Sequence, residues 1–222
     1  GNYNTAIGYR ALSGASAGIG FGTAQQNVTI GYTAMEAATS AKENVAIGNY
    51  AAGDMTTGEY NVVIGRSALE KATASNRNVA IGYAAMYLHS QASDGYNVAL
   101  GMYAMQNVET GSSNVAIGYT ALNGVAGNDM DYNVAIGAQA IYYNTTGDSN
   151  VGVGRNALFA NTTGYQNTAI GTSAGESNTT GYGNVFIGYN AGVNTGHDTE
   201  SNKLVIANSA TTTPLIEGDF SS

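Results

Sequence analysis

The pentapeptide Asn-Val-Ala-Ile-Gly, or a close variant of it, recurs eleven times along the 222 residues of this chain. Its opening Asn stands at 4, 27, 44, 61, 78, 97, 114, 133, 150, 167 and 184, so that seven of the ten steps are 17 residues long and the others are 19 or 23. A nearly fixed period marks a repeat architecture, in which each unit buries its apolar face only by stacking on its neighbours. Most of the sequence is therefore scaffold.

Four positions of the repeat, counted from the Asn as position 0, are nearly invariant. Position 4 is Gly and position 7 is Ala in all eleven copies, while position 1 is Val and position 3 is Ile in nine copies each. Position 8 is usually Leu, Met or Ile. The central copies supply the residues that we expect to define the structure, namely Asn27, Asn44, Asn61, Asn78, Asn97, Asn114 and Asn133, Gly31, Gly48, Gly65, Gly82, Gly101, Gly118 and Gly137, and Ala34, Ala51, Ala68, Ala85, Ala104, Ala121 and Ala140.

The spacing of the apolar residues predicts a short strand in each repeat. Val and Ile two residues apart lie on one face of a strand, and we expect that face to point inward, with the intervening Ala and the Gly on the other face. The Gly provides either a positive φ at a corner or room for another backbone to approach. The Ala at position 7 indicates a tightly packed site. The Asn residues fit a stacked ladder at a corner better than a set of ligands.

These features predict an all-β fold, a parallel β-roll or solenoid with about 17 residues per coil. Each coil has room for about two strands and two corners, and stacked coils repeat at roughly 4.8 Å. Paired helices of normal length do not fit the same period. Residues 1–200 form an eleven-coil shaft, and residues 201–222 are expected to leave it as a cap or connector. At that point Ile206 replaces the corner Gly, and Pro214 lacks the donor that a central strand needs.

The composition excludes several classes of protein. Charged residues make up 10 % and apolar residues 43 %, which argues against disorder. A net charge of −8 with only seven Lys and Arg makes nucleic acid an unsuitable partner. No apolar run approaches membrane-spanning length, so we expect no membrane insertion. Because the first residues already lie within a repeat, we expect the chain to be cut from a longer protein.

We expect no catalytic residue, no cofactor and no metal. His89 and His197 have no Cys or acidic partner at ligand spacing, and no Ser/His/Asp arrangement stands out. Two pairs of acidic residues could meet similar acids on a neighbouring chain, which leaves glycosidase chemistry or calcium binding as minor alternatives. These pairs are Asp129 with Asp131 and Asp198 with Glu200.

Tyrosines and glycosylation sequons recur in register with the repeat. Tyrosines gather at position 5 and just before the Asn, where their rings either brace the corners or contact glycan. They are Tyr9, Tyr32, Tyr83, Tyr119 and Tyr189 at the first place, and Tyr3, Tyr60, Tyr96 and Tyr132 at the second. Sequons begin at Asn27, Asn144, Asn161 and Asn178, but the repeat itself generates all four.

A coil of this size is thin, and one chain cannot cover all of its apolar surface. With Val and Ile inward, the small Ala/Gly face would remain in water along the whole rod. Soluble monomers rarely expose such a surface, and closed homo-oligomeric symmetry is the usual way to cover it. The sequence therefore predicts self-association.

The repeat resembles two known families of fibrous proteins. The Asn-Val-Ala-Ile-Gly-Tyr-x-Ala pattern is similar to the head repeats of trimeric autotransporter adhesins. Asn4–Leu12, Asn114–Leu122 and the Asn-Thr-Thr-Gly turn at Asn144–Gly147 resemble the repeat regions of phage tail-fibre proteins even more closely. The similarity covers residues 1–195. Residues 201–222 resemble the segment that precedes a self-cleaving trimerisation chaperone, which would lie beyond Ser222 or have been removed.

This resemblance implies a left-handed parallel β-roll with three chains around one axis, intertwined or side by side. It implies the shaft of a phage tail fibre or similar appendage, located on a virion or a cell surface, which projects a host-receptor-binding tip. The alternatives are a bacterial surface adhesin whose variable coil edges bind glycan or matrix, and a fibre-embedded polysaccharide depolymerase. Eleven coils without a large insertion favour the shaft, because binding and catalytic sites are usually built on loops.

Overall fold

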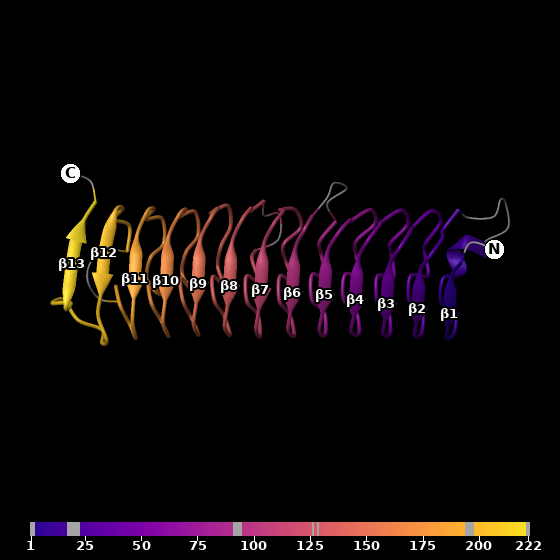
Figure 1. Cartoon of the computed structure of the whole chain (residues 1–222), viewed down its shortest axis with the longest axis horizontal. Helices are drawn as coiled ribbons and strands as arrows, with labels where there is room; N and C mark the ends of the chain where they lie inside the picture. Colours follow the sequence, from indigo (N-terminus) through magenta and orange to yellow (C-terminus); the bar gives the residue numbers. More distant parts are fainter. Residues whose placement is uncertain are drawn as a thin grey trace.

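The chain forms a long rod of stacked β coils. In a computed structural model, residues 3–16, 23–90, 95–125, 127, 129–193 and 198–220 are described. Their regular structure consists of strands and one short 3-10 helix, and the strands follow one another along the rod in sequence order (Figure 1). The predicted all-β parallel solenoid with about 17 residues per coil is therefore confirmed.

All strands of the repeats are short and start directly after the repeat Asn. The elements are β1 (Thr5–Ile7), η1 (Ser13–Ser16), β2 (Val28–Ile30), β3 (Val45–Ile47), β4 (Val62–Ile64), β5 (Val79–Ile81), β6 (Val98–Leu100), β7 (Val115–Ile117), β8 (Val134–Ile136), β9 (Val151–Val153), β10 (Thr168–Ile170), β11 (Val185–Ile187), β12 (Lys203–Ile206) and β13 (Ile216–Asp219).

The strands β1 to β12 form one parallel ladder in which equal repeat positions pair. Val45 of β3 lies opposite Val62 of β4, and Ile47 lies opposite Ile64. Stacking at about 4.8 Å per strand makes this ladder on the order of 50 Å long. Because the register follows the repeat, each column of the rod consists of one repeat position.

The parallel ladder extends past residue 201, where we expected the chain to leave it, because β12 adds one more parallel strand. Leu204 pairs with Val185, and the backbone N–H of Lys203 takes the place of a repeat Asn by donating to the Asn184 side chain at 2.9 Å. The residue in line with the corner Gly is consequently Ala207 and not Ile206. The chain then reverses, and β13 closes the sheet as an antiparallel strand.

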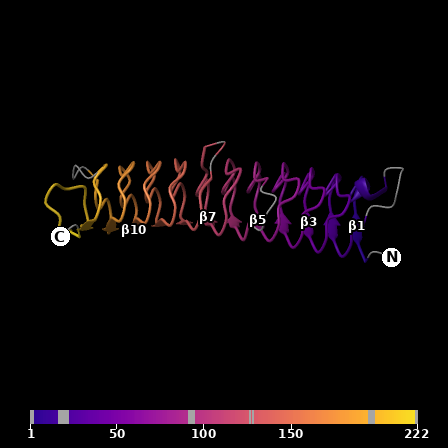
Figure 2. The same cartoon turned by 90° about the horizontal axis from the view of Figure 1, so that it is seen from above.

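The second side of each coil is a run of turns, whereas we expected a second strand there. Outside the strands, β pairing takes the form of isolated bridges, such as those from Gln25 to Lys42 and from Lys42 to Glu59. Positions 6 and 8 take positive φ, for example 51° at Thr33 and 47° at Met35. This alternation lets successive N–H groups bond along the rod in opposite directions, from Thr33 to Tyr9 O at 2.8 Å and from Met35 to Ala51 O at 2.9 Å. We call this side the turn wall and the strand side the strand wall (Figure 2).

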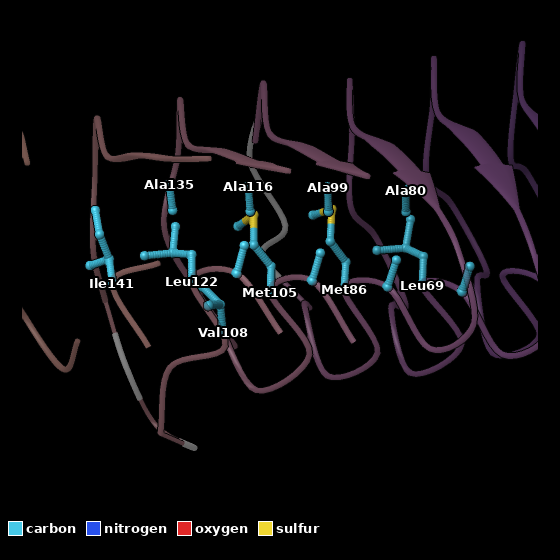
Figure 3. Packing of buried hydrophobic residues seen from close by; sticks show 14 of the residues in the cluster. Leu69, Ala80, Met86, Ala99, Met105, Val108, Ala116, Leu122, Ala135 and Ile141 are labelled. Carbon is cyan, nitrogen blue, oxygen red and sulfur yellow. The ribbon is translucent and has the colours of Figure 1, made fainter. Parts of the chain in front are cut away.

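The interior lies between these two walls and is lined by Ala from the strand wall and Leu, Met or Ile from the turn wall. In Figure 3, Ala80, Ala99, Ala116 and Ala135 point from the strands toward the long side chains of Leu69, Met86, Met105 and Leu122. These eight side chains are fully buried. The core thus consists of two facing columns, the central strand residues and the position-8 residues, which run continuously along the repeats.

The expectation that Val and Ile point inward is wrong for the single chain. In β7, Val115 and Ile117 are partly exposed while Ala116 is fully buried, and the other repeat strands from β2 to β11 bury the same central position. The physical reason is the narrow interior, because the Leu or Met at position 8 already fills the space opposite the strand. Only a small strand residue fits there, so the branched side chains point outward.

Candidate assembly surface

The corner Gly at position 4 sets the end of each strand. Gly48 has φ 136°, and a Cβ on it would lie 2.6 Å from the carbonyl oxygen of Gly65 in the next coil. Gly101 stands in the same relation to Gly118, also at 2.6 Å. Both a positive φ and a close backbone approach therefore restrict this column to Gly.

The repeat Asn residues form a buried hydrogen-bonded ladder along one corner. The side-chain oxygen of Asn97 accepts the backbone N–H of Asn114 at 2.9 Å and its Nδ2 at 3.1 Å. The same Nδ2 of Asn114 donates to the carbonyl of Met130 at 2.7 Å. This pattern links the Asn residues from Asn4 to Asn184 and makes them structural, since each amide satisfies backbone groups of two other segments.

A second Asn ladder runs through the Asn-Thr-Thr-Gly turns. Asn144 accepts from the N–H of Gly147 at 3.1 Å, and Asn161 donates to Asn144 at 3.2 Å. Asn178 continues the column with a donor bond to Asn161 at 3.0 Å. Asn27, in the first ladder, and these three residues hold the four sequons, and their amides are buried and hydrogen-bonded. A glycan cannot be attached to any of them in the folded chain.

The Ala column at position 7 lies inside the coil. Every member from Ala34 to Ala191, including Ala68, Ala104 and Ala140, is fully buried. Each lies just before the position-8 residue, which is a long side chain in most coils, so the two columns together form the inner side of the turn wall. None of the Asn, Gly or Ala columns presents a reactive group to solvent.

The outer side of the strand wall presents the Val and Ile columns to solvent, and we call this surface the Val–Ile face. It consists of positions 1 and 3 of β2 to β11. The exposed fraction is 36 % at both Ile117 and Ile136, 45 % at Ile170 and 37 % at Ile187. The sequence led us to expect an uncovered Ala/Gly face, but the uncovered apolar surface is this larger, branched one.

The Val–Ile face is flat, continuous and uncharged. No Asp, Glu, Lys or Arg occurs in the repeat strands β1 to β11. Strands that pair in parallel are normally covered on both faces. With ten strands about 4.8 Å apart, the face covers on the order of several hundred Å², which is the size of patch that marks an interaction surface.

Tyrosine rings stack along the corners and stay partly exposed. Tyr9 and Tyr32 stack with ring centroids 5.2 Å apart, and Tyr165 and Tyr182 stack at 4.7 Å. Exposed fractions of 64 % at Tyr9 and 44 % at Tyr32 leave one side of these rings in solvent. Stacking accounts for their register along the rod, and the exposed side of each ring is accessible to a ligand.

The candidate acidic pairs serve local structure. Asp131 accepts from the N–H of Ser112 at 2.6 Å and from its hydroxyl at 2.9 Å, while Glu200 lies 3.5 Å from the Lys203 ammonium. Within the described ranges, no three His, Cys, Asp or Glu side chains form a group that could hold a metal ion. His197 lies outside the described residues, as do most of the extra residues of the first and second longer steps, at 17–22 and 91–94.

His89 is buried in the core, in the column that holds Met55, Ala72 and Val108 in other coils. Burial lowers the pKa of His89 to about 4, and the backbone of Val108 opposes the shift. Its Nε2 lies 3.5 Å from Nδ2 of Asn97. The ring is therefore neutral at pH 7 and acts as a core side chain.

No helix among the described residues is long and apolar enough to cross a membrane. Comparison of the chain with known proteins gives no match to a family model, to a curated protein or to a solved structure. The function of the chain must therefore be inferred from its own geometry. In that geometry the Val–Ile face is an extended apolar surface that a single chain leaves uncovered.

Proposed function

We propose that this chain is a shaft segment of a homotrimeric fibre, such as a phage tail fibre or a similar surface appendage, that projects a receptor-binding tip. The observation that carries the proposal is the Val–Ile face. An uncharged parallel sheet surface of this length needs a cover, and a second copy offers the same flat apolar surface in the same register.

The geometry favours chains that lie side by side over chains that intertwine. Each coil is closed by hydrogen bonds within one chain, such as Val45 N–H to Asn61 O at 2.9 Å and Gly65 N–H to Ile47 O at 2.8 Å. The core between the two walls is likewise complete in one chain. Only the outer side of the strand wall remains to be covered, which is the requirement for packing finished rods around a common axis.

The copy number of three and the fibre context come from the resemblance of the repeats to tail-fibre and adhesin segments. The shaft role is supported by the regularity of the rod, because a uniform ladder from β1 to β12 transmits length and stiffness. A shaft of this kind belongs on a virion or a cell surface.

Analytical ultracentrifugation of the purified chain tests the assembly. We expect a species of three times the 22.6 kDa chain mass at micromolar concentration. Replacing Ile117 and Ile136 together by Glu places charges on neighbouring strands of the Val–Ile face and should dissociate it. The matched control replaces Gln106 and Gln139 on the turn wall together by Glu, which adds the same two charges away from the face and should leave the assembly intact.

A folded monomer of the unmodified chain at micromolar concentration would contradict the proposal, and a stable dimer would correct its copy number. The shaft role has a separate test in electron microscopy of the full-length protein. A biotin label placed at an exposed turn residue of this segment, such as Thr146, should appear along the stem. A label at the distal tip would instead favour the adhesin alternative.

A further inference from the structure

A depression of about 530 Å³ lies on the outer side of the turn wall, over the first four coils. Its size is within the range of roughly 300–1,000 Å³ that is typical of small-ligand sites. One rim is made by position 6 of successive coils, with Arg10, Thr33 and Tyr50. The opposite rim is made by positions 9 and 10, with Asp54 and Lys71 among them. The repeat itself therefore generates the two rims.

The depression exists because position 9 of the third coil is Gly53. The other coils carry side chains there, such as Tyr87, Tyr142 and Phe159. The backbone is the same in both cases, since the N–H of Gly53 donates to Tyr50 O at 3.1 Å and that of Phe159 donates to Asn156 O at 3.2 Å. Only the missing side chain opens this stretch of the wall.

Fixed charged groups and one exposed ring surround the gap. Arg10 pairs with Glu36 at 2.5 Å at one end, and Lys71 pairs with Asp54 at 3.1 Å and with Glu70 at 3.2 Å at the other. The hydrogen bonds that the Lys71 ammonium donates to Asp54 and then to Glu70 raise the pKa of Lys71, so it stays a cation. These pairs hold donors and acceptors at defined places beside the gap.

Two further features point to a polar ligand with an apolar side. The Tyr50 ring is 39 % exposed and offers a flat apolar surface at the rim. Thr33 also lines the depression, and its hydroxyl is buried without a hydrogen-bond partner among the described residues. Buried hydroxyls are normally satisfied, so this polar group is one that a bound molecule or water should serve.

We propose that this depression binds a neutral oligosaccharide, with one sugar ring seated over Gly53 against Tyr50 and its hydroxyls bonded to the flanking ion pairs. A sugar ring combines an apolar face with many hydroxyls that both donate and accept, which matches a ring platform beside mixed charges. The two cations and three carboxylates sum to a charge of −1, which disfavours sialylated and sulfated glycans.

The site is compatible with the proposed assembly but does not depend on it. Its lining residues belong to the turn wall, across the core from the strand wall, so rods packed through the Val–Ile face leave it open. A fibre with three such chains would present three equal sites, and weak single-site affinity would be reinforced on a dense glycan surface.

The test measures binding of maltotetraose, cellotetraose and chitotetraose, beside sialyllactose and a heparin tetrasaccharide, by surface plasmon resonance and calorimetry. Gly53→Tyr fills the depression with a side chain that the same position carries in other coils, so folding should be preserved. We expect it to weaken binding of the best neutral glycan by tenfold or more, and Tyr50→Ala to do the same. The matched control is Gln106→Tyr, at position 9 of a coil outside the depression, which should leave binding unchanged.

Failure to bind any of the neutral tetrasaccharides overturns the proposal, as does stronger binding of the acidic glycans. Binding that survives Gly53→Tyr also overturns it, because the ligand would then lie elsewhere on the rod. Sedimentation of the same samples keeps this result apart from the shaft proposal. A trimer that binds no glycan refutes only the site, and a monomer that binds glycan refutes only the assembly.

Discussion

Phe186 of β11 fills the space that Gly175 leaves open on the opposite wall of the core. A Cβ on Gly175 would lie 2.6 Å from Cδ2 of the Phe186 ring, and a ring carbon is 2.5 Å from the equivalent point on Gly192. Phe186 is the largest fully buried side chain among the described residues. The coil accommodates it because both neighbouring position-8 residues are Gly.

The same exchange of size recurs along the rod between position 2 of one coil and position 8 of the coil before it. Ala99 faces Met86 (Figure 3). Gly152, in contrast, faces Ile141, whose Cγ1 lies 2.8 Å from where a Cβ of Gly152 would be. By the same offset, Val63 follows the small Ala52. The core thus keeps a constant volume per coil while its residues vary.

Exchanging the large and small residues across the core should preserve stability. Phe186→Ala alone leaves a cavity and should lower the free energy of unfolding by about 3–5 kcal/mol. Gly175→Leu alone overfills the site and should cost at least ~1–3 kcal/mol. Together they recreate the Ala–Leu pair of Ala135 and Leu122, so urea unfolding of the double variant should show a favourable coupling of about 1–3 kcal/mol. Strictly additive losses would show that the two residues do not share one space.

Which face of each strand points into the core could not be predicted from the alternation of residues alone. Alternation predicts that Val and Ile share one face and Ala the other, but it does not say which face is inside. The β-branched face suggested a core, yet the interior is too narrow for it once position 8 holds Leu or Met. The compensation of Val63 by Ala52 and of Phe186 by Gly175 is present in the sequence and would have assigned the Ala side to the interior.

The parts of the fold that were predictable are those that one repeat position determines. The corner Gly has its positive φ and its close contact in each coil, so an invariant Gly is a direct signal. The depression at Gly53 was not predictable, because it depends on side chains from four coils that only the stacking register brings together. The extra strand β12 was missed since Lys203, and not Asn202, takes the ladder position.

Removing one Asn of the ladder should destabilise the rod strongly, because each Asn side chain satisfies buried backbone groups of two other segments. Asn114→Ala deprives the N–H of Asn133 of its acceptor at 2.9 Å and the carbonyl of Met130 of its donor at 2.7 Å, both inside the molecule. Unpaired buried groups cost about 1–3 kcal/mol each, so the loss should reach several kcal/mol. Thermal unfolding at fixed concentration measures it, with the partly exposed Asn107→Ala as the control.

The positive φ before each repeat Asn should make Gly a stabilising residue at that place. Ser149 is exposed with φ 58°, and the repeat already has Gly183 at the same position with φ 65°. Ser149→Gly relieves about 1 kcal/mol of steric cost, partly offset by the greater freedom of the unfolded chain. We expect a small gain for Ser149→Gly and a loss of about 1 kcal/mol for Gly183→Ala. The urea midpoints of the two variants test this expectation. Equal losses of stability in both variants would show that the positive φ at this position does not determine stability.

His89 should make the folded rod sensitive to mild acid. The unfolded chain protonates this imidazole near pH 6.5, whereas burial holds the pKa in the folded chain at about 4. Between these values the unfolded state binds more protons, so stability is full above pH 6.5 and falls as the pH drops through this window. The loss is complete below pH 4 and amounts to roughly 3 kcal/mol.

Replacing His89 by Met should remove this part of the acid dependence. Met55 occupies the same column two coils earlier, so the side chain fits the core, and it carries no proton. The free energies of unfolding of the two proteins should differ by a constant above pH 6.5, and toward pH 4 the variant should gain roughly 3 kcal/mol relative to the parent, because only the parent loses stability through His89. Carboxylates titrate equally in both proteins and cancel in the difference. Parallel stability curves from pH 7 to pH 4 would show that the His89 ring becomes protonated without leaving the folded core.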